Sequence, residues 1–239
     1  MLIPNSIYIN QEKLPDNVIP ENQEQIINEI YQKLNNDINK INVTEVLLNN
    51  KDKYIFFKTD HHMTSLGAYL TYNEFCLVSN KQPKLLQNFE EKIVSKDFLG
   101  TFDSKAQVPN QETDIISIYV NEKNTNVEVQ YDNETTNSIY NEEYLSKKDK
   151  YSYFLNGNNA KVVVKTNGQN GKKLLLIKDS YSHIMAQFLC QDYEELHFID
   201  PRYYKLSLSE YARNNEITEI LFLYNVSNIV SDLGLVTIK

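Results

Sequence analysis

The sequence predicts an α/β fold in which helices flank a mainly parallel, doubly wound sheet. One reason is that strand-like and helix-like segments alternate through the second half of the chain. We expect strands over 173–178, 195–200 and 219–226, and helices over 181–191 and 206–214. The other reason is the unbroken apolar run from Leu174 to Ile177, which is typical of a parallel strand buried on both faces.

The first half gives a less regular pattern. Residues 1–20 are expected to be extended, because prolines recur there. A helix is predicted over 21–41 from apolar residues at helical spacing, and another from Thr64, a good N-cap, to Val78. The remaining expectations are a short strand or helical turn over 43–50, a short strand over 53–59 and a helix over 85–94.

Residues 97–160 differ in composition from their surroundings. They are rich in Asn, Asp, Glu, Thr and Tyr, with short strand candidates over 115–120 and 127–131. We interpret this segment as an insertion or lid carried on the main sheet. The chain as a whole, residues 1–239, is then expected to form one domain.

Composition excludes several classes of protein. A net charge of −8 argues against a nucleic-acid partner, and no apolar run approaches the roughly 20 residues of a membrane helix, so we expect a soluble chain. No signal peptide is recognisable at the start. The two cysteines, Cys76 and Cys190, lie in apolar contexts and are expected to be free, buried thiols with no zinc-site spacing.

Two segments are placed where an open α/β sheet binds its ligands, at the carboxyl ends of strands. "FFKTDHH" ends at Asp60, His61 and His62, and "LLLIKDSYSH" places Ser180 where a helix begins. A serine there exposes its hydroxyl beside free helix N–H groups that can hold an oxyanion. Such a serine needs a base, and the base needs an orienting group.

Side-chain direction favours one histidine as the base. In extended chain, residues i and i+2 point to the same side, so Asp60 can orient His62 while His61 points elsewhere. Other interpretations stay open. Ser180 could be a simple helix cap, and the stretch from Asp60 to His62 could be a polar loop or a metal site. We expect no metal, because no further Cys or His segment completes a ligand set. His183 follows Ser180 by one helical turn and could line the same pocket.

Several segments together resemble the bacterial DHHW family. "YIFFKTDHHMTSLGAY" is similar to its signature Y-x-K-T-D-H-H-W-T-x-x-G-A-Y, and "DFLGTFDSKA" to its F-x-G-T-x-x-S-K segment. "LLLIKDSYSH", "FIDPRYY" and "ILFLYNVSN" resemble its nucleophile segment and closing strands. The resemblance extends from about residue 3 to about residue 230, with the segments in the family's order.

The family is similar to the SGNH hydrolases and to the alginate-type polysaccharide O-acetyltransferases. The resemblance therefore implies an SGNH-like three-layer α/β/α fold and a triad of Asp60, His62 and Ser180, with no cofactor. Met63 replaces the family's tryptophan, which puts substrate preference in question. The usual SGNH oxyanion blocks are not recognisable. The candidates for substrate or oxyanion contacts are Tyr181, Arg202, His183 and His61.

The implied activity is transfer or hydrolysis of acetyl esters on an extracytoplasmic polysaccharide, through an acetyl-serine intermediate. The sequence does not choose between a transferase and an esterase, and a membrane protein that passes acetyl groups is a possible partner. Family members usually carry an N-terminal membrane anchor and a first sheet segment, so we expect this chain to be a truncated form. The alternative function is a non-catalytic cell-surface or carbohydrate-binding protein that keeps the fold.

Overall fold

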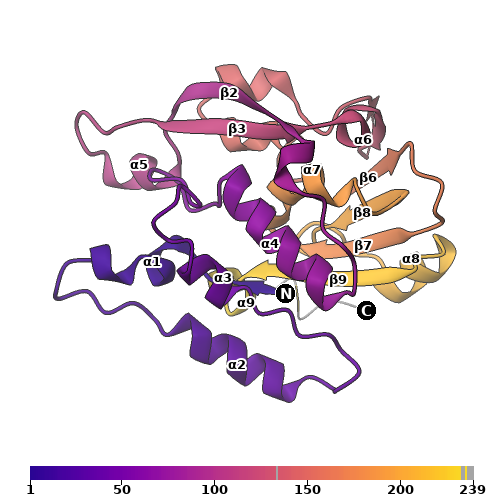
Figure 1. Cartoon of the computed structure of the whole chain (residues 1–239), viewed down its shortest axis with the longest axis horizontal. Coiled ribbons are helices and arrows are strands. Elements are labelled where there is room, and N and C mark those ends of the chain that lie inside the picture. The colour runs from indigo at the N-terminus through magenta and orange to yellow at the C-terminus, as the bar shows by residue number, and fades with distance from the viewer. Residues whose placement is uncertain (133, 233–234, 236–239) are drawn as a thin grey trace.

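A seven-stranded sheet forms the centre of the molecule (Figure 1). The computed structural model describes residues 1–132, 134–232 and 235. The strand order is β1-β9-β7-β8-β6-β4-β5. The strands are β1 (Leu2–Ile3), β4 (Val127–Gln130), β5 (Thr135–Thr136), β6 (Lys161–Thr166), β7 (Lys173–Lys178), β8 (Glu195–Ile199) and β9 (Glu219–Asn225).

Strand direction divides this sheet into two parts. The neighbours β1, β9, β7 and β8 pair in parallel, whereas β6, β4 and β5 pair in antiparallel fashion at the other edge. Since β4 lies two antiparallel steps from β8, five of the seven strands run in the same direction. The predicted mainly parallel α/β sheet is confirmed at this level.

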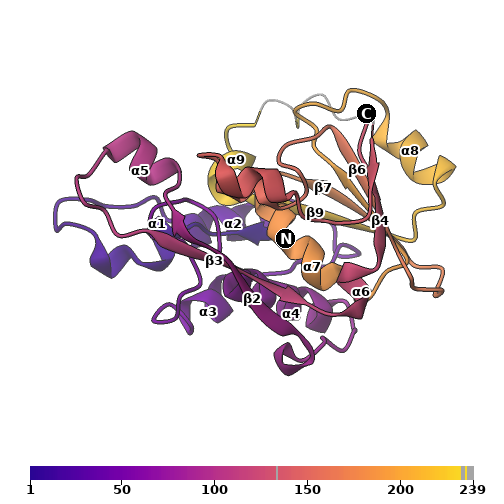
Figure 2. The same ribbon diagram turned by 90° about the horizontal axis from the view of Figure 1, so that it is seen from above.

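Helices cover both faces of the parallel part (Figure 2). Along β7, Leu174 and Leu176 join the core beneath α4 (Ser65–Val78) and α7 (Ala186–Leu189). Leu175 faces the other way, toward α8 (Leu208–Asn214). Tyr224 of β9 packs on that face against α2 (Gln23–Lys33). The unbroken apolar character of β7 therefore reflects burial on both faces, as predicted.

Short helices make most of the connections. The α-helical ones are α1 (Ser6–Ile9), α3 (Thr44–Leu48), α5 (Thr101–Ala106), α6 (Glu122–Thr125) and α9 (Val226–Ile229). The 3₁₀ segments are η1 (Gln11–Lys13), η2 (Leu86–Asn88), η3 (Glu142–Ser146), η4 (Lys150–Tyr153) and η5 (Ser180–Met185).

A separate two-stranded ribbon packs beside α4 and α7. It consists of β2 (Glu90–Phe98) and β3 (Asp114–Val120), paired antiparallel with register shifts. Ser65 Oγ donates to Ser117 O at 2.6 Å, and Tyr119 N donates to Gln187 Oε1 at 2.7 Å. The helix predicted over 85–94 is therefore wrong, because pairing with β3 overrides the local pattern.

Other element predictions also need correction. The first 20 residues contain α1 and η1, and the helix predicted over 21–41 ends at Lys33, before the turn-forming residues 35–37. Residues 53–59 form no strand, and their only ladder contact is an isolated bridge between Phe56 and Met63. β6 was not predicted, and the helix predicted over 181–191 starts as the 3₁₀ segment η5.

The segment 97–160 connects to both sheets. It supplies β3 of the ribbon and β4 and β5 at the antiparallel edge of the main sheet. Cys76 and Cys190 are free and buried, as expected, and burial raises the pKa of each thiol to about 12. Across the described residues, no helix combines the length and apolar character needed to cross a bilayer.

Candidate active site

The nucleophile turn, residues 178–182, continues directly from β7. Asp179 N donates to Leu223 O at 3.3 Å, which extends the β7–β9 ladder by one bond. The Asp179 side chain then caps the start of η5 by accepting from Tyr181 N at 2.9 Å. Ser180 follows the cap, so strand pairing and capping together fix its backbone.

Asp179 also fastens this turn to the end of β9. Its Oδ2 accepts from Asn225 N at 2.9 Å and from Asn228 Nδ2 at 2.7 Å. Burial raises the pKa of the carboxyl, while these donors and Tyr181 N lower it again. The residue before the nucleophile is thus a fully buried anchor.

The base loop, residues 56–63, is held in a different way. It closes on itself through Phe57 N, which donates to His62 O at 3.2 Å. Asp114, at the start of β3, is 2% exposed and accepts four hydrogen bonds from the chain just before Asp60. The donors are Tyr54 Oη at 2.6 Å, Lys58 N at 2.9 Å, Thr59 N at 2.7 Å and Thr59 Oγ1 at 2.6 Å.

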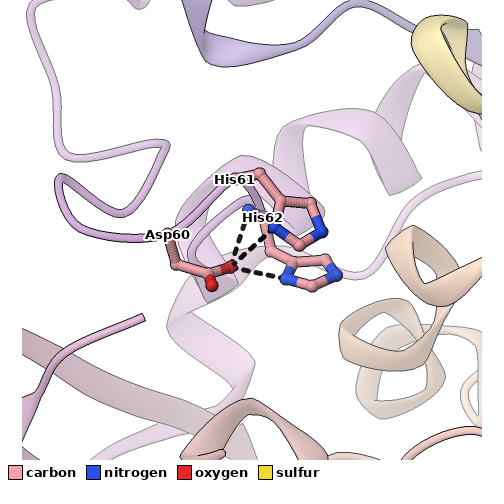
Figure 3. Close-up of side chains that lie close together, drawn as sticks. All are labelled: Asp60, His61 and His62. Carbon is pink, nitrogen blue, oxygen red and sulfur yellow. Dashed lines mark hydrogen bonds and ion pairs between the residues drawn. The ribbon is translucent and has the colours of Figure 1, made fainter. Parts of the chain in front are cut away.

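These two segments bring Asp60, His62 and Ser180 into one hydrogen-bonded chain. His62 Nδ1 lies 2.6 Å from Asp60 Oδ1, and His62 Nε2 lies 2.8 Å from Ser180 Oγ (Figure 3 shows the first pair). A carboxylate accepts only, so His62 carries its proton on Nδ1 and leaves the Nε2 lone pair for the serine hydroxyl. Both distances are within the range required of a nucleophile and its base.

Both carboxylate oxygens of Asp60 accept hydrogen bonds. Besides His62 Nδ1, Oδ1 accepts from His62 N at 3.0 Å, and Oδ2 accepts from Thr101 N at 2.8 Å and Thr101 Oγ1 at 3.0 Å. Burial alone would raise the pKa of this carboxyl, but its bonds to His62 and Thr101 hold the pKa well below the usual range. Asp60 is therefore ionised and fixed in orientation, as an orienting carboxylate must be.

Gly100 allows this close approach. A Cβ at position 100 would lie 2.5 Å from Asp60 Oδ2 and 2.7 Å from Asp60 Cγ. Only a residue without a side chain can bring the Thr101 donors this near to Asp60.

Tyr151 of η4 covers His62 on one face. The two rings are stacked with centroids 3.5 Å apart and planes 6° apart. Tyr151 Oη also donates to Ser180 O at 3.1 Å. One tyrosine from segment 97–160 therefore contacts both the base and the nucleophile.

The structure places the other predicted site residues in varied roles. Tyr181 N–H is taken by Asp179, and Tyr181 Oη donates to His61 O, so this residue supports the site rather than offering a free backbone donor. In the described part of the chain, Ser180 N–H has no acceptor, which leaves it available for an oxyanion. His61 lies in the site and is half-buried. It does not point away from Asp60 as expected: its Nδ1 lies 3.6 Å from Asp60 Oδ1, because residues 58–62 form a bend and not an extended segment.

His183 and Arg202 belong to a buried ionic network next to the nucleophile turn. Lys178 Nζ lies 2.7 Å from His183 Nε2 and 3.4 Å from Asp200 Oδ2. Arg202 forms a two-pronged pair with Asp200, Nε at 2.9 Å and Nη2 at 2.6 Å. His183 Nδ1 is buried with no partner among the described residues, and burial lowers the pKa of the ring well below its usual value.

Met63 does not line the site. It is fully buried, and its sulfur accepts from Thr71 Oγ1 at 3.4 Å. Met63, which departs from the family signature, is therefore a core residue of this chain.

The triad carboxylate and the histidine pair could in principle hold a metal ion. One ligand atom from each of Asp60, His61 and His62 lies within 4.8 Å of the others. However, both ring nitrogens of His62 are already within hydrogen-bond distance of Asp60 and Ser180. A metal here would displace the hydrogen bonds that link His62 to its neighbours, so the geometry fits the triad better.

A cavity of about 450 Å³ borders the base loop. It is lined by Tyr54, Phe57, Lys58 and Phe102, together with residues of the first 14 positions and of 51–53. None of the triad side chains borders it, so its volume is no measure of the catalytic site.

Five supporting residues were missed by sequence reasoning: Gly100, Thr101, Asp114, Tyr151 and Asp179. The stretch "DFLGT" carried a family signal, although no role could be attached to its glycine and threonine. Asp179 directly precedes Ser180, and the sequence alone assigns it no role. Asp114 and Tyr151 gave no signal, because they reach the site only through tertiary folding.

Comparison with solved structures identifies proteins of the same fold. A DHHW family protein from Eubacterium siraeum matches with 26% identity and a TM-score of 0.86, over 98% of this chain and 78% of that one. Bacillus cereus PatB1 with a sulfonyl adduct matches with 21% identity and a TM-score of 0.80, over 100% and 84%. The O-acetyltransferase domain of Pseudomonas putida AlgJ matches with 11% identity and a TM-score of 0.54, over 98% and 77%.

Sequence comparison gives the family. No curated protein matches the chain significantly. A model of the DHHW protein family matches residues 1–199, most of the 239-residue sequence. The resemblance drawn from the motifs is confirmed: this chain belongs to the DHHW family.

Proposed function

We propose that this protein is a serine-dependent acyltransferase or esterase of the SGNH-like kind, acting on acetyl esters of an extracytoplasmic polysaccharide. The observation that carries the proposal is the continuous chain from Asp60 through His62 to Ser180, with separations of 2.6 and 2.8 Å. Two proteins of similar fold support it: the O-acetyltransferase domain of AlgJ, and PatB1, which has been solved with a sulfonyl adduct.

The first half of the reaction forms an acetyl-serine. Ser180 Oγ attacks the acetyl carbonyl carbon while its proton moves to His62 Nε2, and Ser180 N–H donates to the developing oxyanion. The bond to the departing oxygen breaks, and His62 returns the proton to that oxygen. Asp60 holds the ring in the required tautomer and stabilises the imidazolium that forms.

The second half releases the acetyl group. An acceptor hydroxyl or water attacks the acetyl carbonyl carbon while His62 Nε2 takes its proton. Ser180 Oγ then leaves and receives that proton back, which restores the enzyme. Transfer and hydrolysis share every residue up to this point and differ only in the acceptor.

Acetylation of the serine tests the proposal directly. The protein, treated with a chelator, is incubated with 4-nitrophenyl acetate, and the peptide carrying "DSYSH" is examined by mass spectrometry. We expect one acetyl group on Ser180, and Ser180→Ala should lower turnover by a factor of about a thousand or more. Ser182→Ala is the matched control, since Ser182 Oγ only donates to Asp179 O at 3.0 Å.

Two outcomes would contradict the proposal. Turnover in Ser180→Ala within a few-fold of wild type would place the chemistry elsewhere or leave a carbohydrate-binding protein as the better account. Activity that disappears on chelation and returns with an added metal ion would favour a metal site at Asp60, His61 and His62.

A further inference from the structure

His61 lies beside the base but is no part of the proposed proton path. Its ring centroid is 3.8 Å from that of His62, with the planes tilted by 38°. Its side chain is 37% exposed, whereas that of His62 is 7% exposed. The carbonyl of His61 accepts from Tyr181 Oη, so the residue is fixed on the open side of the site.

The hydrogen bonds around Thr101 determine the tautomer of His61. Thr101 Oγ1 donates its single proton to Asp60 Oδ2 at 3.0 Å. His61 Nδ1 lies 2.7 Å from the same hydroxyl oxygen, which can then only accept, so Nδ1 carries the ring proton. His61 Nε2 is therefore a lone-pair acceptor.

This acceptor nitrogen faces the reacting side. Figure 3 shows both rings with one nitrogen toward Asp60 and the other nitrogen pointing away from it in the same direction. For His62 that remote nitrogen is the one beside Ser180 Oγ. Burial and the neighbouring His62 lower the pKa of His61 to about 4, so the ring stays a neutral acceptor near neutral pH.

Attack on the acetyl-serine limits which hydrogen-bond donor His61 Nε2 can accept from. The hydroxyl that attacks the acetyl-serine has one proton, and His62 takes it. His61 Nε2 must therefore accept from a different donor on the same acceptor molecule. Since the two rings lie side by side, that donor sits next to the reacting hydroxyl.

We propose that His61 Nε2 accepts a hydrogen bond from a second hydroxyl of the acceptor, so that the site selects vicinal diols over simple alcohols. This inference rests on the proposed acetyl-serine intermediate. It makes His61 a specificity-determining residue for acceptors such as sugar rings. It also gives the second histidine of the motif a role distinct from that of the base.

Partition of the acetyl-enzyme between paired acceptors tests the inference. The enzyme is acetylated with 4-nitrophenyl acetate in the presence of a methyl glycoside or of its deoxy analogue, which lacks the neighbouring hydroxyl. Acetylated products and free acetate are then quantified by chromatography. We expect wild type to favour the diol about three- to tenfold, the range that one hydrogen bond supplies.

Two variants separate selection from general damage. His61→Phe keeps an aromatic ring but has no acceptor, so the preference for the diol should vanish through a higher KM for that acceptor. His61→Gln retains an acceptor oxygen on a side chain of similar length and should restore part of the preference. In each case the measured quantity is the ratio of the two acceptors, which a uniform loss of activity would not change.

The failures of the two proposals are distinguishable. If no acetyl-enzyme forms, the proposed function fails and this inference fails with it. If acetyl-enzyme forms but wild type treats the diol and its deoxy analogue alike, only the role of His61 is overturned. The same conclusion follows if His61→Phe leaves the preference at its wild-type value.

Discussion

The nucleophile turn and the base loop contribute to the same triad, but different interactions hold them. The nucleophile turn extends β7, and Asp179 ties it to Asn225 and Asn228 at the end of the neighbouring strand. The base loop contains no strand and is held by hydrogen bonds to residues that follow it by 40 to 60 positions, through Thr101, the backbone N–H of Phe102 and the side chain of Asp114. One element is positioned by the sheet and the other by a few buried hydrogen bonds.

This contrast has an energetic consequence. A turn anchored by a sheet shares the cooperative stability of the core, whereas a loop held by one or two carboxylates depends on each of them. Removing one partner of a buried hydrogen bond leaves the other unsatisfied, at a cost of about 1–3 kcal/mol. We therefore expect single substitutions at the supports of the base loop to impair the site disproportionately.

The largest effect is expected for Gly100→Ala. The added Cβ would lie 2.5 Å from Asp60 Oδ2, so either Asp60 or the Thr101 donors must move. Displacing a catalytic group by about 1 Å costs about a hundredfold in rate, and we expect at least that loss in kcat for 4-nitrophenyl acetate.

Gly171→Ala serves as the control for Gly100→Ala. A Cβ at Gly171 meets no atom within 4 Å, and the residue is unfavourable for alanine only because its φ is +67°. It should lower stability by about 1 kcal/mol while kcat stays near wild type. Equal kcat in the two variants would show that the contact with Asp60 does not matter.

Asp114→Asn should have the next largest effect. Asp114 accepts four hydrogen bonds, and an amide in its place turns one acceptor oxygen into a donor that faces other donors. We expect the free energy of unfolding, measured in urea, to fall by about 2–3 kcal/mol, with a parallel loss of kcat.

Asp97→Asn provides the matched acidic control for Asp114→Asn. Its side chain is 74% exposed and pairs with Lys150 at the surface, so little change in stability or activity is expected. If Asp114→Asn were as stable and active as this control, the base loop would not depend on its buried carboxylate.

The smallest effect compares, through pH, the buried His183 beside the nucleophile turn with the half-buried His61 of the base loop. The folded pKa of His183 is well below the ordinary value of 6.5, and that of His61 is about 4. The unfolded chain therefore binds more protons below about pH 6.5, and stability falls as the pH drops through that value. For buried His183 this slope reaches up to about 1.4 kcal/mol per pH unit, and for His61, whose side chain is 37% exposed, solvent screening makes it smaller.

Urea titrations between pH 7.5 and 3 measure this slope. His183→Gln should flatten the pH dependence of the free energy of unfolding by about one histidine, and His61→Gln by less, because its side chain is partly exposed. The contribution of His61 should level off near pH 4, whereas that of His183 should continue below it. A slope in His183→Gln equal to that of wild type would show that His183 does not stay neutral in the folded state.

Local patterns in the sequence were sufficient for the nucleophile side of the site. The apolar run of β7 followed by Asp179 and Ser180 predicts a buried strand that leads into a capped helix, because each step depends on neighbouring residues. The spacing of Asp60 and His62 predicted the closer of the two carboxylate–histidine contacts, which is 2.6 Å long. It did not predict the direction of His61, whose Nδ1 lies 3.6 Å from Asp60 Oδ1 because residues 58–62 are bent rather than extended.

Tertiary structure alone decided the contacts between segments that are distant in the sequence. His62 and Ser180, which are 118 positions apart in the sequence, are brought to a 2.8 Å contact by the fold. The ring of Tyr151, the four bonds to Asp114 and the close approach of Gly100 also depend on segments that meet only when the chain folds. The helix predicted over 85–94 failed for the same reason, because residues 90–93 pair with β3 residues 24 to 30 positions away, from Glu90 with Val120 to Ile93 with Ser117. Local sequence encodes backbone preference and side-chain direction, whereas long-range partners are fixed by the packing of the whole core.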